Sequence, residues 1–143
     1  MGFKVYDANE VTLNFAGIPI DSGFDDGEFI RIEQESDDFV DKAGTDGEVT
    51  RSKTNDRRTT VTVILMQSSD GNAALSALNN IDRLANNGAG VAPILISDRQ
   101  GLQIFAAAEA WIAKPPDISY DREPTAREWM IRVANPERFD GGN

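Results

Sequence analysis

The order of apolar and polar residues along this chain predicts a mainly β protein. In residues 59–66, β-branched Thr and Val alternate before Ile64, Leu65 and Met66, so this is the strongest predicted strand and we expect it to be central in the sheet. Asp98-Arg99-Gln100-Gly101 has the composition of a tight hairpin turn. Similar patterns predict strands at 11–15, 29–33, 91–97, 102–113 and 128–134, with a further short strand at 118–120.

One segment has helical spacing instead. Ser68, Ser69 and Asp70 are suitable N-caps, and Asn86-Asn87-Gly88 ends the pattern. A helix this short is marginal alone, so its apolar stripe is expected to cover a sheet, where each buried Leu or Ile contributes roughly 1.5–3 kcal/mol. The predicted core face consists of Leu75, Leu78, Ile81 and Leu84.

Two segments lack a strong pattern. Residues 39–58 are polar and punctuated by glycine, and we predict a long polar loop with at most a short strand at its start. Residues 135–143 contain Pro136 and two glycines near the end, and we predict a mobile tail. The fold class predicted for residues 1–143 is a single domain: a β-sandwich or barrel of about seven or eight antiparallel strands with one flanking α-helix.

The length and composition of the chain are consistent with a single domain outside a membrane. The chain has 143 residues, 40% of them hydrophobic, which is enough for one core. No run approaches the roughly 20 apolar residues of a membrane span, and the first residues lack the apolar stretch of a signal peptide. We therefore expect a soluble protein that is made in the cytoplasm and does not enter a membrane.

The chain contains neither Cys nor His. This excludes disulfides, thiolate nucleophiles, Ser-His-Asp triads and zinc sites with the usual ligands. Two carboxylate alternatives remain: a glycosidase-type pair at Glu33 and Glu35, without a visible aromatic cleft, and a calcium site, without the EF-hand order of ligands. The prediction is a protein that is not an enzyme and binds no cofactor or metal. The calcium alternative involves Asp37, Asp38, Asp41 and Asp46.

Charge is distributed unevenly along the chain. The net charge is −10, and the first fifty residues hold thirteen acidic and three basic residues, while the other ninety-three hold eleven of each. The acidic residues of the first fifty positions either only keep the protein soluble or form a surface that repels anions. The basic run at 51–58 has no interleaved aromatic residue, which favours a solvated or interface loop over nucleic-acid binding. Acidic Glu33, Glu35, Asp37 and Asp38 on one copy would complement Arg51, Lys53, Arg57 and Arg58 on another.

The residues in four segments, at 42–52, 65–67, 79–84 and 127–129, together resemble the tail tube proteins of contractile-tailed bacteriophages. The similarity runs from about Val11 to Val133, and Gly47-Glu48-Val49-Thr50-Arg51-Ser52 is its most specific part. It implies a two-sheet β fold with one flanking helix, and hexameric rings stacked into a tube whose inner wall is a β-barrel that passes DNA. The segments are 42–52, Leu65-Met66-Gln67, Asn79 with Ile81-Asp82-Arg83-Leu84, and Arg127-Glu128-Trp129.

The resemblance also implies a location and partners. The protein would be a virion structural subunit, made in the host cytoplasm, whose partners are its own copies and the tail sheath, baseplate and tail terminator proteins. DNA would pass without specific binding, and Glu33, Glu35, Asp37 and Asp38 are candidates for the channel lining or an acidic interface. The candidates for contacts between subunits are Asp46, Glu48, Arg51, Lys53, Arg57 and Arg58.

Two other functions remain open at this point. A tail terminator, tail completion or baseplate protein of a phage would form one ring without polymerising. A small β-sandwich ligand-binding module would stay monomeric and hold a small molecule.

Overall fold

The computed structural model describes residues 2–142, so Met1 and Asn143, at the two ends of the predicted domain, lie outside the described residues. Within residues 2–142 the chain forms ten β-strands, one α-helix and a short 3-10 helix. In chain order the elements are η1 Ala8–Glu10, β1 Val11–Phe15, β2 Ile18–Ile20, β3 Ile30–Gln34, β4 Phe39–Ala43, β5 Val49–Lys53, β6 Thr59–Met66, α1 Gly71–Leu84, β7 Ala92–Asp98, β8 Ile104–Lys114, β9 Ala126–Val133 and β10 Glu137–Phe139.

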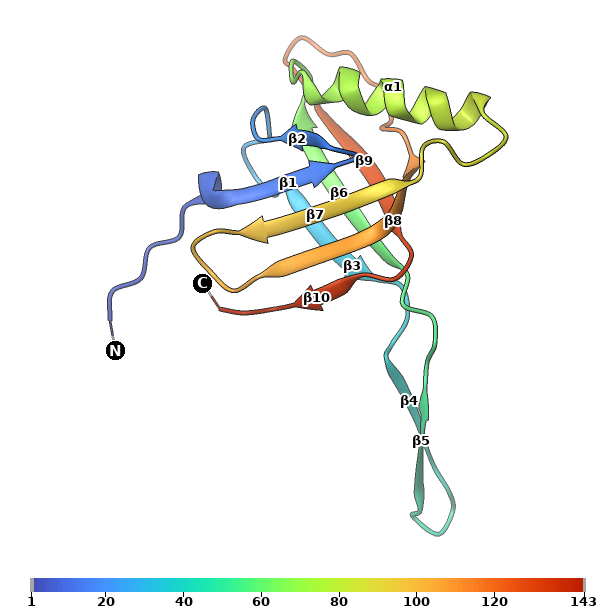
Figure 1. The fold of residues 1–143 in the computed structure, drawn as a ribbon. Coiled ribbons are helices and arrows are strands. Elements are labelled where there is room, and N and C mark those ends of the chain that lie inside the picture. The colour runs from blue at the N-terminus through green and yellow to red at the C-terminus, as the bar shows by residue number, and fades with distance from the viewer. Residues whose placement is uncertain (1, 143) are drawn as a thin grey trace.

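Eight of these strands form one antiparallel sheet that folds over itself. The strand order is β2-β1-β7-β8-β9-β6-β3, and β10 pairs with β8. In Figure 1, β1, β7, β8 and β10 form one layer, and β9, β6 and β3 cross behind it. The first half of β8 pairs with β7 and β10 and its second half with β9, so this long strand belongs to both layers. The predicted mainly β sandwich with one flanking helix is confirmed.

The core lies between the two layers. Seven of the eight residues of β6 are buried, and this central strand pairs with β9 on one side and β3 on the other. Alternate residues of β9 face the same core, and Trp129 is 2% exposed. The indole Nε1 of Trp129 donates a hydrogen bond of 2.9 Å to Oδ1 of Asn72, which satisfies the one polar atom of this buried ring.

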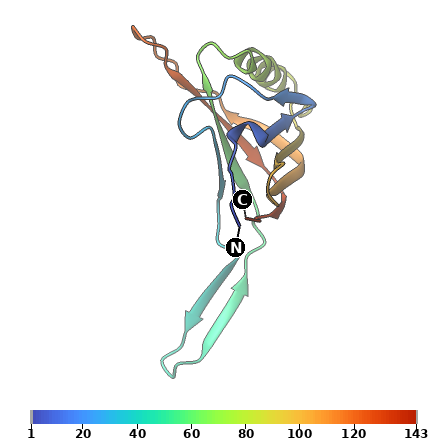
Figure 2. The ribbon, with the colours of Figure 1, turned by 90° about the vertical axis from the view of Figure 1, so that its left-hand side faces the viewer.

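Helix α1 covers one end of the sandwich (Figures 1 and 2). Leu75 is fully buried and Leu78 packs against the core, whereas Ile81 is 53% exposed and Leu84 is 86% exposed. The predicted core face is therefore wrong for Ile81 and Leu84. The physical reason is that helical spacing reports a stripe of apolar residues but not the length of the surface that this stripe meets.

The start of α1 packs closely against β6. A Cβ atom at Gly71 would lie 3.1 Å from Cδ1 of Leu65, so glycine lets the helix approach β6. Ser69 caps this end, because its Oγ accepts a hydrogen bond of 3.2 Å from the N–H of Gly71, while the Asp70 side chain makes no capping hydrogen bond.

Besides the short strand β2, for which no strand was predicted, three segments differ from the sequence-based expectation. The predicted loop at 39–58 contains the β4–β5 hairpin, and the tail that was predicted to be mobile contains β10. The strand predicted at Ile118 and Tyr120 is absent, and residues 115–125 form an exposed loop between β8 and β9. Backbone pairing explains the two added elements, because their side chains are exposed and give no apolar pattern. None of the helical residues between 2 and 142 builds a segment long and apolar enough to cross a membrane.

Candidate assembly interface

The β4–β5 hairpin projects from the body of the molecule (Figures 1 and 2). Every residue of both strands is exposed. Its tip is tightly built: the N–H of Gly44 donates to the carbonyl of Glu48 at 2.8 Å, and the N–H of Gly47 donates to the carbonyl of Gly44 at 3.1 Å. Gly47 has φ +90°, which only glycine adopts readily. An isolated hairpin is marginally stable in water, so a contact with another surface would stabilise this one.

Both faces of the hairpin carry apolar and charged side chains. Residues directly opposite each other share a face, and the pairs Asp41↔Arg51 and Ala43↔Val49 therefore lie on the face of Phe39. The Arg51 guanidinium stands 4.1 Å above the centre of the Phe39 ring, in a cation–π contact. Phe39 and Val49 are nevertheless 44% and 65% exposed, and Val40 is exposed on the other face. An exposed aromatic ring beside an Arg is a combination that is enriched in protein–protein contacts.

The predicted contact residues are divided between the hairpin and its base. Asp46 and Glu48 lie at the tip, where an Asp46 carboxylate oxygen accepts the N–H of Glu48 at 3.1 Å, and Arg51 and Lys53 lie on β5. Arg57, by contrast, donates to the carbonyl of Pro136 at 3.3 Å and lies outside the hairpin. The residues that the sequence grouped as one basic patch are Arg51, Lys53, Arg57 and Arg58.

Arg58 belongs to a polar cluster at the base of the hairpin. Its Nε and Nη2 atoms each donate to the Asp56 carboxylate at 2.9 Å, and its backbone N–H donates to the same group at 3.2 Å. Ser36 adds a hydrogen bond of 3.3 Å. The Arg58 side chain, followed by its backbone N–H, holds the pKa of Asp56 well below its usual range. Asp56 therefore joins Arg58 to Ser36 across the base of the hairpin.

The acidic candidates on the body are partly matched by cations. Ile30 and Ile32 of β3 pack against the core, so Glu33 lies on the opposite face of this strand, where an oxygen of its carboxylate is 3.3 Å from Nη1 of Arg31. Glu35 accepts a hydrogen bond from the Thr60 hydroxyl and lies 3.9 Å from Nη2 of Arg132. This outer face of β3, β6 and β9 therefore carries charges of both signs.

The remaining acidic candidates do not form a metal site. Asp38 accepts a hydrogen bond of 2.7 Å from Nε2 of Gln34, and Asp37 is exposed. Across residues 2–142, no three carboxylate side chains come together in a way that could hold a metal ion. Asp37, Asp38, Asp41 and Asp46 are thus spread along the base and the hairpin and are not gathered at one point.

The sandwich has unpaired strand edges. In the part of the chain that the structure describes, β2, β3 and β10 each pair with one strand only. An edge strand presents backbone N–H and C=O groups that can pair with another chain. These three edges and the hairpin are the elements that could join copies of this protein.

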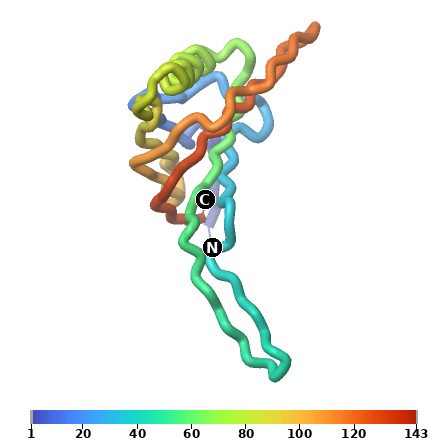
Figure 3. Tube along the Cα trace, turned by 90° about the vertical axis from the view of Figure 1, so that its right-hand side faces the viewer, coloured from blue at the N-terminus to red at the C-terminus, as the bar shows by residue number. Residues whose placement is uncertain are grey.

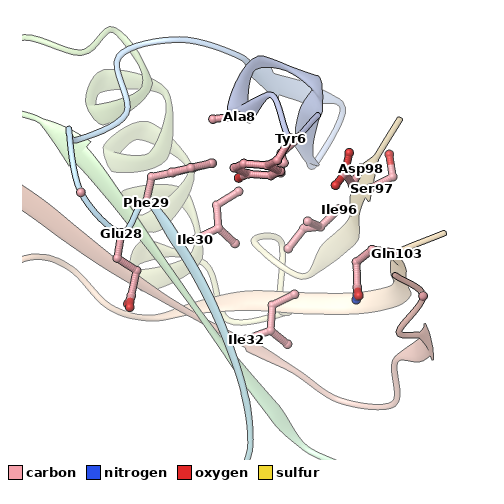
Figure 4. Close-up of a pocket in the computed structure, with 13 residues that line it drawn as sticks. Tyr6, Ala8, Glu28, Phe29, Ile30, Ile32, Ile96, Ser97, Asp98 and Gln103 are labelled. Atoms are coloured by element: carbon pink, nitrogen blue, oxygen red, sulfur yellow. The ribbon is translucent and has the colours of Figure 1, made fainter. Parts of the chain in front are cut away.

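An apolar cavity of about 590 Å³ lies beside the β3 edge (Figure 4). Ile30 and Ile32 of β3 line one side and Ile96 of β7 lines the other. Phe29 and Tyr6 add further apolar surface, and the polar part of the lining includes Glu28, Ser97, Asp98 and Gln103. Sequence reasoning missed this cavity because its walls come from segments more than sixty residues apart. The available signal was Ile30 and Ile32, two apolar residues on the same face of a predicted strand.

Comparison with known sequences and folds agrees with this architecture. The sequence model of a family described as bacteriophage PhiTE tail tube protein matches residues 11–139. The structural protein ORF10 of Pseudomonas phage KPP10 is 31% identical over 145 residues, which cover 98% of this chain and 84% of the phage protein.

Three solved structures share the fold. The sheath/tube terminator of the extracellular contractile injection system PVC has a TM-score of 0.64 at 12% identity and covers 96% of this chain and 99% of its own. The tube terminating cap of the anti-feeding prophage has a TM-score of 0.61 at 9% identity and covers 97% and 93%. A PVC sheath-tube complex has a TM-score of 0.60 at 11% identity and covers 93% and 90%.

These structural likenesses concern the fold alone, because the identities are low. The family match covers all of the sandwich from β1 to β10, and the 31% identity extends over nearly the whole sequence. The chain therefore belongs to the bacteriophage PhiTE tail tube protein family.

Proposed function

We propose that this chain is a non-enzymatic structural subunit of a bacteriophage tail tube, which assembles as hexameric rings stacked around a channel for DNA. The observation that carries the proposal is the family match over residues 11–139, which includes both the sandwich and the hairpin. In this proposal the protein is made in the host cytoplasm, resides in the phage tail and contacts the sheath, baseplate and tail terminator proteins.

Closing a ring requires that one surface of each copy docks on a different surface of the next. The free edges of β2, β3 and β10 supply backbone groups for pairing between copies. The hairpin and the 115–125 loop project from opposite ends of the molecule (Figures 2 and 3). The hairpin of one copy can therefore reach beyond its own sandwich to a neighbouring subunit or ring, where Phe39, Val40 and Val49 would become buried.

The charge of the chain suits a channel that conducts DNA without holding it. A net charge of −10 repels phosphates over about a Debye length of 8 Å at physiological salt. Glu33, Glu35, Asp37 and Asp38 remain our candidates for the channel lining or for an acidic contact. Because Arg31 and Arg132 accompany the two glutamates, we expect weak repulsion at that face and stronger repulsion at the aspartates.

Mass measurement combined with negative-stain electron microscopy tests the proposal. We expect the purified protein to change from small species to hollow rings or tubes of uniform width as its concentration rises. A particle with the mass of one chain at every concentration and salt, and no rings on the grid, would contradict it.

A tail terminator is the second candidate, because two of the three structural neighbours are tube-terminating proteins. A terminator would form one ring and stop, whereas a tube protein forms rings that stack. The length distribution of the particles in the same micrographs separates the two functions.

A further inference from the structure

The apolar cavity beside β3 is an open groove of the sandwich, which we call the β3 groove. It is open because β3 is the last strand of its layer, so that Ile30 and Ile32 pack against the core on one side but stay partly exposed. In Figure 4 their side chains face the space that Ile96 borders from the other layer. With a volume of about 590 Å³, the groove has room for more than one large side chain.

Residues 3–6 form an arm that precedes η1 and carries unusually exposed apolar side chains. Phe3, Val5 and Tyr6 are 93%, 57% and 59% exposed. The arm is extended and leaves the body of the molecule (Figure 1). Within the described chain, the backbone of residues 2–6 has no hydrogen-bond partner, so these N–H and C=O groups are available to another strand. Among the arm residues, Tyr6 alone lines the β3 groove of its own chain.

The arm and the groove also have complementary charge. The segment 21–28, which borders the groove through Gly27 and Glu28, holds four carboxylates and no basic residue. Glu28 is paired with Arg31, so the unmatched charge of this border comes from the aspartates of the segment. Lys4 is the single basic residue in the first thirty residues. An arm docked along β3 would bring Lys4 to this acidic border, where a salt-dependent attraction would set its direction.

We propose that the β3 groove binds the N-terminal arm, residues 3–6, of a second copy of this chain. Phe3 and Val5 enter the groove, and the arm backbone adds to the free edge of β3 as a further strand. Apolar side chains that are exposed on one copy thereby cover apolar side chains that are exposed on the next, and the unpaired edge is removed. The proposal rests on the proposed function only in taking the partner to be a second copy.

The β4–β5 hairpin is a weaker occupant for the groove. Its two strands already pair with each other, so the backbone N–H and C=O groups between them are hydrogen-bonded and cannot pair with β3. The arm, in contrast, has its whole backbone free along residues 2–6.

Thiol cross-linking tests the arm contact directly, because the chain has no cysteine and every introduced thiol is unique. We would prepare three single variants with different size tags: Val5→Cys, Ile32→Cys and, as the matched control, Leu84→Cys on the exposed end of α1. Mixing the first two variants under mild oxidation with diamide gives a mixed disulfide only if the arm of one copy reaches the groove of another.

We expect at least tenfold more mixed disulfide from Val5→Cys with Ile32→Cys than from Val5→Cys with Leu84→Cys. The control is demanding because Leu84 is 86% exposed and its replacement thiol is more accessible than one in the groove. Equal yields would overturn the proposal. It would also be overturned if the double variant Val5→Cys/Ile32→Cys gave a disulfide within one chain while the mixed pair gave none.

A second variant keeps the test independent of the introduced thiols. Phe3→Ser with Val5→Ser removes the apolar part of an arm that touches little else, so the unfolding midpoint should not change. We expect the concentration at which rings or tubes appear to rise at least tenfold, and an unchanged concentration would count against the arm contact. Tubes without the mixed disulfide would refute the arm contact and leave the proposed function standing. The mixed disulfide without rings or tubes would support the arm contact and contradict the proposed function.

Discussion

Helix α1 supplies a prediction in which two leucines of one helix should behave in opposite ways. Leu75 has no exposed surface, whereas Leu84 is 86% exposed. Replacing a buried Leu with Ala removes its transfer free energy and leaves a cavity, which together cost about 2–5 kcal/mol. For a fully buried side chain we expect about 3 kcal/mol from Leu75→Ala. An exposed substitution without special contacts changes stability by about 0.5 kcal/mol or less, which is our expectation for Leu84→Ala.

Urea unfolding of dilute protein, kept below the concentration at which it assembles, measures both effects. With an m-value of about 2 kcal/mol per molar urea, the Leu75→Ala midpoint should fall by about 1.5 M and the Leu84→Ala midpoint by about 0.25 M or less. Equal m-values would show that the comparison is valid. Similar losses from the two substitutions would refute the reasoning, because they would mean that α1 packs on the sandwich along its whole length.

The remaining predictions concern the hairpin and its base. Replacing Phe39 and Val49 with Ser should leave the unfolding midpoint unchanged but abolish rings or tubes on the grid, while Thr50→Ser serves as a control. Gly47→Ala places a side chain at φ +90°, so we expect weaker assembly with normal global stability, and normal assembly would contradict a contact role for this tip. The depressed pKa of Asp56 stabilises the folded chain above the ordinary carboxyl value of about 3.9, and this contribution is lost as the pH falls through the lowered pKa. The stability difference between wild type and Asp56→Asn should therefore be constant from pH 6 to 9 and shrink below pH 4, as measured by urea midpoints, and a difference that grows in acid would contradict this sign.

Strands whose side chains meet the core could be predicted from the sequence. β9 alternates between buried and outward positions, and β6 is buried over nearly its whole length. Burial of this kind selects apolar and β-branched residues, and the sequence shows that pattern. The same holds for the turn at 98–101, where the N–H of Gly101 donates to the carbonyl of Asp98 at 3.2 Å. Hydrophobic pattern and turn composition reflect the same local physics that the structure shows.

The hairpin and β10 could not be predicted in this way. Every residue of β4, β5 and β10 is exposed, and their order comes from backbone pairing, which leaves no trace in side-chain polarity. Ile118 and Tyr120 show the reverse case, since two apolar residues suggested a strand where the structure has an exposed loop. Elements that are exposed on all sides lack the internal burial on which such predictions depend.

The candidate site shows a similar limit. The sequence indicated that residues 39–58 carry contact chemistry, but it grouped Arg57 and Arg58 with Arg51 and Lys53. The structure separates these two pairs: Arg57 binds the carbonyl of Pro136 and Arg58 binds Asp56, both at the base of the hairpin. The alternation of Ile30 and Ile32 predicted one wall of the β3 groove, but the groove itself depends on long-range packing between β3 and β7, which no local pattern shows.

The most direct test of the central claim is the rotational symmetry of end-on particles in electron micrographs of the concentrated protein. We predict hollow rings with sixfold symmetry, and side views in which such rings stack into a tube of constant width. Solid particles without a channel, or a protein that stays monomeric at every concentration, would contradict the claim that this chain builds the wall of a tail tube.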